Sequence, residues 1–166
     1  MSVANTEVQT HEWREWLDRL AIQDLIHSYS DAVTRADWVQ CEAVFAPDAI
    51  WESPILGLRY ENRASFMKIL RATSTHDLLI QTPHSSVIML SGANQARATT
   101  TIHEFSRGGQ AREKVNFEQY GIYFDDLARF DGGWRFIHRL FVPVYVGKGC
   151  VTGDLLSPRS ALFRPD

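Results

Sequence analysis

Two stretches decide the fold of this 166-residue chain: IQDLIHSYSDAV at residues 22–33 and YFDDLARFDGGWRFIHR at residues 123–139. In the first stretch, apolar residues recur every three or four positions, which is typical of a helix with one buried face. In the second, two strand-like runs flank an Asp-Gly-Gly turn, which predicts an antiparallel hairpin. The chain is therefore expected to pack one long helix against a sheet built from hairpins.

Along the chain, the predicted helices come first and most of the predicted strands follow them. Asp37 and Asn62 are expected to cap the second and third helices, because their side chains can accept backbone N–H groups left free at a helix start. Glycine-bearing turns separate the later strands and predict antiparallel pairing, so the order indicates an α+β domain. The expected helices cover residues 11–35, 38–45 and 62–73, and the expected strands cover residues 49–52, 58–60, 85–90, 95–106, 111–129 and 134–146.

Composition limits the class of protein. With 45% hydrophobic and 22% charged residues, the chain fits one globular domain at residues 11–146, between a flexible N-terminus at 1–10 and an irregular tail at 147–166. The formal charge of −3 comes from interspersed signs, which argues against a nucleic-acid partner. No apolar run approaches the roughly 20 residues that cross a bilayer, and no secretion signal precedes the domain, so a cytoplasmic location without membrane contact is expected.

The order of the elements resembles the SnoaL-like branch of the nuclear-transport-factor-2-like superfamily, which includes scytalone dehydratase and ketosteroid isomerase. The matching motifs are IQDL at 22–25, Tyr29, DW at 37–38, FAPDA at 45–49 and FDGGWR at 130–135. The resemblance covers residues 13–145. It implies a cystatin-like fold in which helices lid a strongly curved antiparallel sheet, and the sheet forms a cone or α+β barrel around an internal pocket.

The resemblance also implies a catalytic position for His84. Scytalone dehydratase, bile-acid 7-alpha-dehydratase and hexachlorocyclohexane dehydrochlorinase pair an aspartate near the end of the long helix with a histidine that takes a proton from carbon. In this sequence His84, in TPHSS at 82–86, resembles that histidine, and Thr34 stands at the position of the aspartate. A threonine hydroxyl cannot stabilise an imidazolium by charge, so the usual pair is incomplete. The alternative role for His84 is a hydrogen bond to a backbone carbonyl at the start of a strand.

Two further residues match catalytic positions of the superfamily. Tyr29 resembles a tyrosine that donates a hydrogen bond to a substrate oxygen in the bile-acid dehydratase and in ketosteroid isomerase. Arg139 resembles an arginine that accommodates the leaving halide in the dehydrochlorinase. The expected catalytic set is therefore His84, Tyr29 and Arg139, with Thr34 as a weak orienting group. The isomerase base would align with Ser53, so that activity lacks its base here.

Several other residues are expected to line the pocket. Strand alternation puts His103 on one face with Thr99, Thr101 and Phe105, and this face points either into the cone or to solvent. A salt bridge of Asp125 or Asp126 with Arg129 or Arg139 is favoured over acid catalysis. An aromatic wall would suit a hydrophobic cyclic or aromatic ligand, although ordinary core packing is the alternative for most of its members. The expected substrate-binding residues are Thr34, Trp51, Phe66, His103, Tyr120 and Phe141, and the aromatic wall adds Phe117 and Phe136.

The motifs exclude several kinds of site. The histidines show neither HxH nor HExxH spacing, no GxGxxG or Walker loop occurs, and the two cysteines, Cys41 and Cys150, lie far apart without CxxC spacing. Cys41 is expected to be buried in a helix. These patterns favour chemistry without a metal or another cofactor.

The function predicted from the sequence is therefore that of a lyase or isomerase. Such an enzyme would be a cofactor-independent dehydratase or isomerase acting on a hydrophobic cyclic compound. The alternatives left open are a non-catalytic ligand-binding module, the small structural subunit of an aromatic-ring-hydroxylating dioxygenase, and an epoxide hydrolase with an Asp–Arg–Asp arrangement. A homodimer or homotrimer, joined through the outer face of the sheet, is expected.

Overall fold

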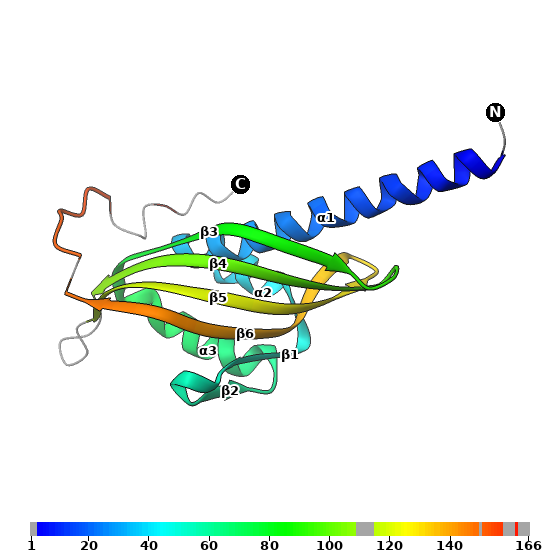
Figure 1. Ribbon diagram of the computed structural model, residues 1–166. Coiled ribbons are helices and arrows are strands. Elements are labelled where there is room, and N and C mark those ends of the chain that lie inside the picture. The colour runs from blue at the N-terminus through cyan, green and yellow to red at the C-terminus, as the bar shows by residue number, and fades with distance from the viewer. Residues whose placement is uncertain (1–2, 109–114, 150, 158–161, 163–166) are drawn as a thin grey trace.

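The long helix α1 (Val3–Arg35) buries one face against the sheet and leaves its first turns without contact to it (Figure 1). The structure is a computed structural model that describes residues 3–108, 115–149, 151–157 and 162, without the side chains of residues 3–11 and 115. The buried face follows the predicted spacing and includes Ile22, Ile26, Tyr29 and Val33. The helix begins at Val3, inside the stretch for which a flexible terminus was predicted.

Both predicted N-caps are confirmed. Asp37 accepts the backbone N–H of Gln40 at 3.0 Å and starts α2 (Trp38–Ala43). Asn62 accepts the backbone N–H of Ser65 at 3.0 Å and starts α3 (Arg63–Ala72). Short 3₁₀ helices, η1 (Pro54–Leu56) and η2 (Thr73–Thr75), follow the first strand and α3. Cys41 is fully buried in α2, as predicted.

The sheet has six strands in the order β2-β1-β6-β5-β4-β3. All neighbouring pairs are antiparallel except β1 and β6, which run parallel. The sheet is curved but stays open, with β2 and β3 as its edges (Figure 1), so the α+β prediction is confirmed and closure into a barrel is not. The strands are β1 (Phe45–Ser53), β2 (Leu58–Tyr60), β3 (His76–Leu90), β4 (Gln95–Gly108), β5 (Val115–Phe130) and β6 (Gly133–Lys148).

The inner face of the sheet, defined here as the face that packs against α1, is identified by alternating burial. On β4 the buried residues are every second one from Ala96 to Ser106, while those between them are more exposed. On β3 this alternation is interrupted between Pro83 and Ser86, where the register with β4 shifts. β3 also starts nine residues earlier than predicted, because its first half pairs with β4 although it lacks a strand-like apolar pattern.

Asp18 on α1 joins the long helix to the hairpin of β5 and β6. Its carboxylate forms an ion pair with Arg129 and accepts a hydrogen bond from the indole N–H of Trp134 at 3.4 Å. The Arg129 guanidinium lies 4.6 Å from the centre of the Trp134 ring. Asp18 is the first buried residue described on α1, so this contact marks the point where the helix joins the body of the protein.

Gly121 on β5 allows the ring of Phe141 to lie across the inner face of the sheet. A Cβ atom at residue 121 would lie 2.3 Å from Cε2 of Phe141 and 3.1 Å from the carbonyl oxygen of Val142. We therefore expect Gly121→Ala to lower the free energy of unfolding by about 1–3 kcal/mol through overpacking. Urea denaturation measures the effect. Gly153→Ala is the control, because nothing lies within 4 Å of its Cβ position, and an equal loss in both variants would contradict the explanation.

Candidate functional site

Arg139 occupies the centre of the interior and brings α1 and the sheet together. Its guanidinium carbon lies 4.2 Å from the ring centres of Tyr29 and Tyr123 and 3.9 Å from that of Phe136. Arg139 is only 1% exposed and Tyr29 only 2%. Two of the three predicted catalytic residues, Tyr29 and Arg139, therefore lie in contact, with the guanidinium on the face of the phenol ring.

Asp125, directly opposite Arg139 on the adjacent strand β5, neutralises the buried guanidinium. Its carboxylate accepts hydrogen bonds from Nε at 2.7 Å and from Nη2 at 2.9 Å. Burial alone would lower the pKa of Arg139, but the Asp125 carboxylate reverses this effect and holds it above its ordinary value. Burial raises the pKa of Asp125, and Arg139 opposes that rise. The predicted salt bridge is confirmed.

Two neutral phenols lie beside this ion pair. Burial raises the pKa of Tyr29 well above its ordinary value, and the neighbouring Tyr123 adds to the rise. Burial also raises the pKa of Tyr123 to about 12, against the opposing effect of Arg139. The two hydroxyl groups are hydrogen-bonded to each other. Both therefore keep their protons at neutral pH, and the hydrogen bond between them engages the proton of one of the two hydroxyl groups.

Three buried polar atoms on β1 and β6 have no hydrogen-bond partner among the described residues. They are Nη1 of Arg139, Nε1 of Trp51 and Oγ of Ser53. Trp51 lies opposite Arg139 in the register of β1 and β6, and Ser53 is two residues further along β1 on the same face. Most buried polar atoms in proteins are hydrogen-bonded, so three unpartnered ones on adjacent strands mark this part of the interior as the candidate site.

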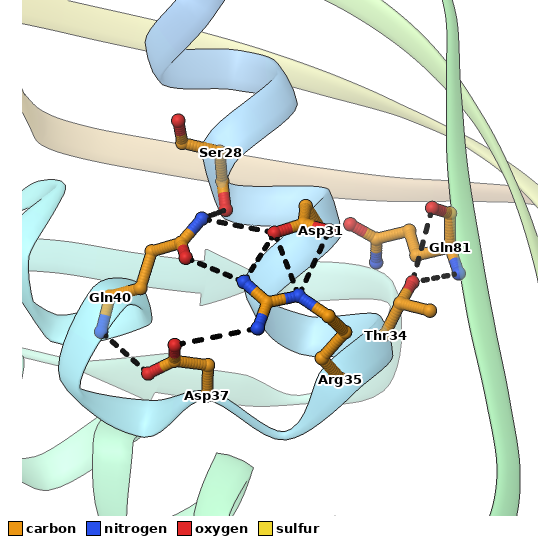
Figure 2. A network of polar contacts seen from close by, with 7 residues as sticks. All are labelled: Ser28, Asp31, Thr34, Arg35, Asp37, Gln40 and Gln81. Atoms are coloured by element: carbon orange, nitrogen blue, oxygen red, sulfur yellow. Dashed lines mark hydrogen bonds and ion pairs between the residues drawn. The ribbon is translucent and has the colours of Figure 1, made fainter. Parts of the chain in front are cut away.

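Gln81, rather than His84, lies opposite Thr34. The Thr34 hydroxyl accepts the backbone N–H of Gln81 at 3.0 Å and contacts its carbonyl oxygen at 3.5 Å. Figure 2 shows this contact beside the end of α1 and, further along, Asp31 in a network with Arg35 and Gln40. Asp31 is a surface residue, as predicted, and its hydrogen bonds from Arg35 lower its pKa.

His84 and His103 lie on the outer face of the sheet, away from Tyr29 and Arg139. His84 is exposed, and its ring lies 6.2 Å from that of His103 at an interplanar angle of 16°. His103 stacks on Tyr120 at 4.2 Å and is hydrogen-bonded to Glu118 at 2.7 Å. Alternation along β3 is the physical reason, because Gln81 faces inward and His84 lies an odd number of residues further on. The geometry expected for His84, close to the phenol and the guanidinium, is therefore wrong, and His103 and Tyr120 are not inside the cone.

A buried carboxylate that the sequence analysis did not single out lies on the inner face. Glu104 accepts hydrogen bonds from Nε2 of Gln81 at 2.8 Å and from Nε2 of Gln119 at 3.0 Å. The same Gln81 nitrogen lies 3.3 Å from the hydroxyl of Tyr123, and the Ser30 hydroxyl donates to Oε1 of Gln81. The signal was present, since Glu104 continues the inward alternation that places Ile102 in the core.

The remaining predicted residues of the pocket wall pack against one another. Phe66 contacts Phe45 with ring centres 4.8 Å apart, and Phe141 contacts Tyr123 at 5.1 Å and Trp51 at 6.4 Å. A surface hollow of about 360 Å³ lies elsewhere, between the start of β3 and the C-terminal segment, and includes Leu78, Ile80 and Arg107.

The sequence model of the family described as "SnoaL-like domain" matches residues 14–140. This chain belongs to that family. No curated protein matches the sequence. Within the described residues of this SnoaL-like protein, no three His, Cys, Asp or Glu side chains are grouped as metal ligands, and no helix is long and apolar enough to span a membrane.

Solved structures share the fold of this SnoaL-like protein. A candidate scytalone dehydratase from Novosphingobium aromaticivorans is 18% identical, with a TM-score of 0.73 over 84% of this chain and 92% of that one. A candidate aromatic ring hydroxylase from the same species is 20% identical, with a TM-score of 0.69 over 79% and 92%. Hexachlorocyclohexane dehydrochlorinase type 3 from Novosphingobium barchaimii is 14% identical, with a TM-score of 0.75 over 88% and 99%. The superfamily predicted from the sequence is confirmed.

The ion pair of Arg139 and Asp125 gives a test of the interior. We expect Asp125→Asn to lower the free energy of unfolding by about 3 kcal/mol or more, because it leaves a buried guanidinium without its counter-charge. A double variant, Asp125→Leu with Arg139→Met, should regain part of the loss, since no buried charge remains. Urea denaturation measures both.

Asp31→Asn is the matched control for this test. Asp31 also pairs with an arginine, but the pair lies on the surface, so a change within about 0.5 kcal/mol is expected. Equal costs for the two asparagine variants would show that Asp125 and Arg139 do not form the buried pair described here.

Proposed function

We propose that this SnoaL-like protein binds an apolar cyclic or aromatic small molecule in its interior and holds an oxygen atom of that molecule with Arg139, Trp51 and Ser53. The observation that carries the proposal is the set of three unpartnered polar atoms on β1 and β6. All three can donate a hydrogen bond, so they suit a carbonyl, carboxylate or hydroxyl oxygen. The aromatic residues around them suit a ring.

The reaction that fits this arrangement is a proton transfer of the dehydratase or isomerase type. An oxygen held by the guanidinium of Arg139 and by the donors of Trp51 and Ser53 carries negative charge more easily, so a proton on the neighbouring carbon becomes more acidic. The elimination enzymes among the structural neighbours support this class of chemistry. His84 does not suit the role of base from the outer face of the sheet.

Glu104 is the group that we assign as proton acceptor. Its carboxylate lies on the inner face and is linked to the Tyr123 hydroxyl through Gln81. In the proposed step the C–H proton moves to the Glu104 carboxylate, and its electron pair forms the enolate whose oxygen faces the donors. An isomerase returns the proton at another carbon. In a dehydratase the C–O bond of the adjacent carbon breaks as the new C=C bond forms, and the departing hydroxide takes the proton from Glu104 and leaves as water.

Binding of 2-tetralone, a bicyclic ketone, tests the oxygen site. We expect it to bind at least about ten-fold more tightly than tetralin, the hydrocarbon without the oxygen, because the ketone satisfies donors that are otherwise unpaired. The double variant Trp51→Phe with Ser53→Ala should bring the two affinities together while keeping the shape of the interior. Isothermal titration measures them. Equal affinity in the wild-type protein would contradict the oxygen site.

Exchange of the C1 protons of 2-tetralone with deuterium from the solvent tests the base. We expect the protein to accelerate the exchange, and Glu104→Gln to reduce the acceleration about 100-fold, because general-base catalysis contributes about that much. His84→Gln is the matched control and should leave the rate unchanged. Proton NMR follows the exchange. A loss in the His84 variant alone would restore the mechanism predicted from the sequence.

A non-catalytic ligand-binding protein is the second candidate. It is favoured by the contact of Thr34 with Gln81, since neither side chain can act as a base at the position where related enzymes are expected to hold an acid–base pair. This candidate predicts tight binding of 2-tetralone without any acceleration of exchange. A structural dioxygenase subunit is disfavoured, because it would have its interior polar groups satisfied internally, unlike Arg139, Trp51 and Ser53.

A further inference from the structure

The first half of α1 carries an apolar surface that the function proposed above does not use. Four large apolar side chains, which we call the α1 stripe, are all more than half exposed: Trp13, Trp16, Leu17 and Leu20. Their spacing of three, one and three residues puts them on one side of a helix. The start of α1 extends beyond the end of the sheet (Figure 1), and the stripe lies next to Asp18 and Arg19, which contact the sheet.

The α1 stripe points away from the protein's own core. At about 100° per residue, its centre lies roughly opposite the helix face that buries Asp18, Ile22 and Ile26. Within the described residues, the rest of the chain therefore leaves it uncovered. Contiguous exposed apolar surface with two tryptophans is typical of a protein interaction site.

We propose that the α1 stripe binds the α1 stripe of a second copy of this chain, as an antiparallel helix pair around a two-fold axis. Such an axis brings the same surface of both copies together, so the stripe has to be complementary to itself. With the axis between residues 16 and 17, Trp16 of each helix lies against Leu17 of the other, and Trp13 lies against Leu20. A large side chain thus meets a smaller one at every position, which permits close packing.

The charges beside the α1 stripe favour the same arrangement. Glu12 and Arg19 lie on the same side of the helix; Glu12 flanks the stripe, and Arg19 lies nearer the buried face, where its Nη1 donates to the backbone carbonyl of Ile88 and its other N–H groups remain for a partner. Antiparallel pairing places Glu12 of one helix beside Arg19 of the other, and the symmetry repeats the contact, which gives two attractive pairs. Parallel pairing would put Glu12 of one copy and Arg19 of the other on opposite sides of the interface, so the two charges would not meet.

The composition of this helix segment argues against a lipid surface. Residues 12–24 contain four acidic residues and two basic ones. Helices that bind anionic membranes carry mainly lysine and arginine on their polar face, so the net acidic charge here is unfavourable. A second copy satisfies both the apolar and the charged residues.

The buried area is sufficient for a weak but specific dimer. Two tryptophans and two leucines from each copy bury on the order of 1,000 Å² in total, counted over both surfaces, which is near the lower limit for a specific interface. The interface is therefore expected to dissociate at low protein concentration. It lies on α1 and is separate from the outer face of the sheet, through which association was expected from the sequence.

Sedimentation velocity of the full chain between about 1 and 100 μM tests the proposal. We expect a dimer at high concentration, and we expect the double variant Trp16→Glu with Leu17→Glu to weaken the dimer at least 100-fold. Val39→Glu is the control, because Val39 is a highly exposed apolar residue on α2, outside the stripe. Circular dichroism verifies that each variant is folded; the substituted side chains are exposed, so unfolding is not expected.

A charge exchange tests the antiparallel register. Glu12→Arg should weaken the dimer, because it places two arginines together, and the double variant Glu12→Arg with Arg19→Glu should restore it.

A wild-type monomer at 100 μM overturns the proposal. So does a dimer that survives the stripe variant, since it would form through another surface, such as the sheet. Failure of the charge exchange to restore the dimer overturns the antiparallel register. None of these outcomes bears on the binding of 2-tetralone, so the two proposals fail separately.

Discussion

The buried ion pair between Arg139 and Asp125 is the constraint on which the arrangement of the interior depends. A guanidinium removed from water needs a counter-charge and acceptors, and Asp125 supplies both from the adjacent strand. Because two hydrogen bonds fix the guanidinium, the rings of Tyr29, Tyr123 and Phe136 pack against it at defined positions. Tyr29 belongs to α1, so this cluster also holds the helix against the sheet.

The same pair creates the conditions for ligand binding. Asp125 occupies Nε and Nη2 of Arg139, while Nη1 has no partner among the described residues. The indole N–H of Trp51, on the neighbouring strand, also has no hydrogen-bond partner among the described residues. An ion pair that served only stability would leave no buried donor unsatisfied, because each one costs free energy. These unpaired donors are the groups to which we assign the ligand oxygen in the proposed function.

Local and periodic features of the sequence were sufficient for most of the fold. Asp37 was predictable as a cap because capping depends on a few consecutive residues, and Tyr29 was predictable as buried because helical spacing is regular. The start of β3 was not predictable, because its first half is a strand through pairing with β4, and a local sequence pattern does not indicate such pairing. Within the site, alternation along β6 and β5 could suggest Arg139 and Asp125 as partners, whereas the shift after Pro83 had no signal.

The placement of β3 against α1 decides which side chains enter the interior. The Thr34 hydroxyl contacts only backbone atoms of residue 81. These contacts place residue 81 opposite the helix, and they do not depend on which side chain residue 81 carries. Gln81 and His84 are three residues apart, and two residues separated by an odd number of positions on a strand face opposite ways. The glutamine at the inner position can then bond Glu104, and the imidazole is left outside. The proton acceptor that we propose for this interior is therefore the Glu104 carboxylate and not an imidazole.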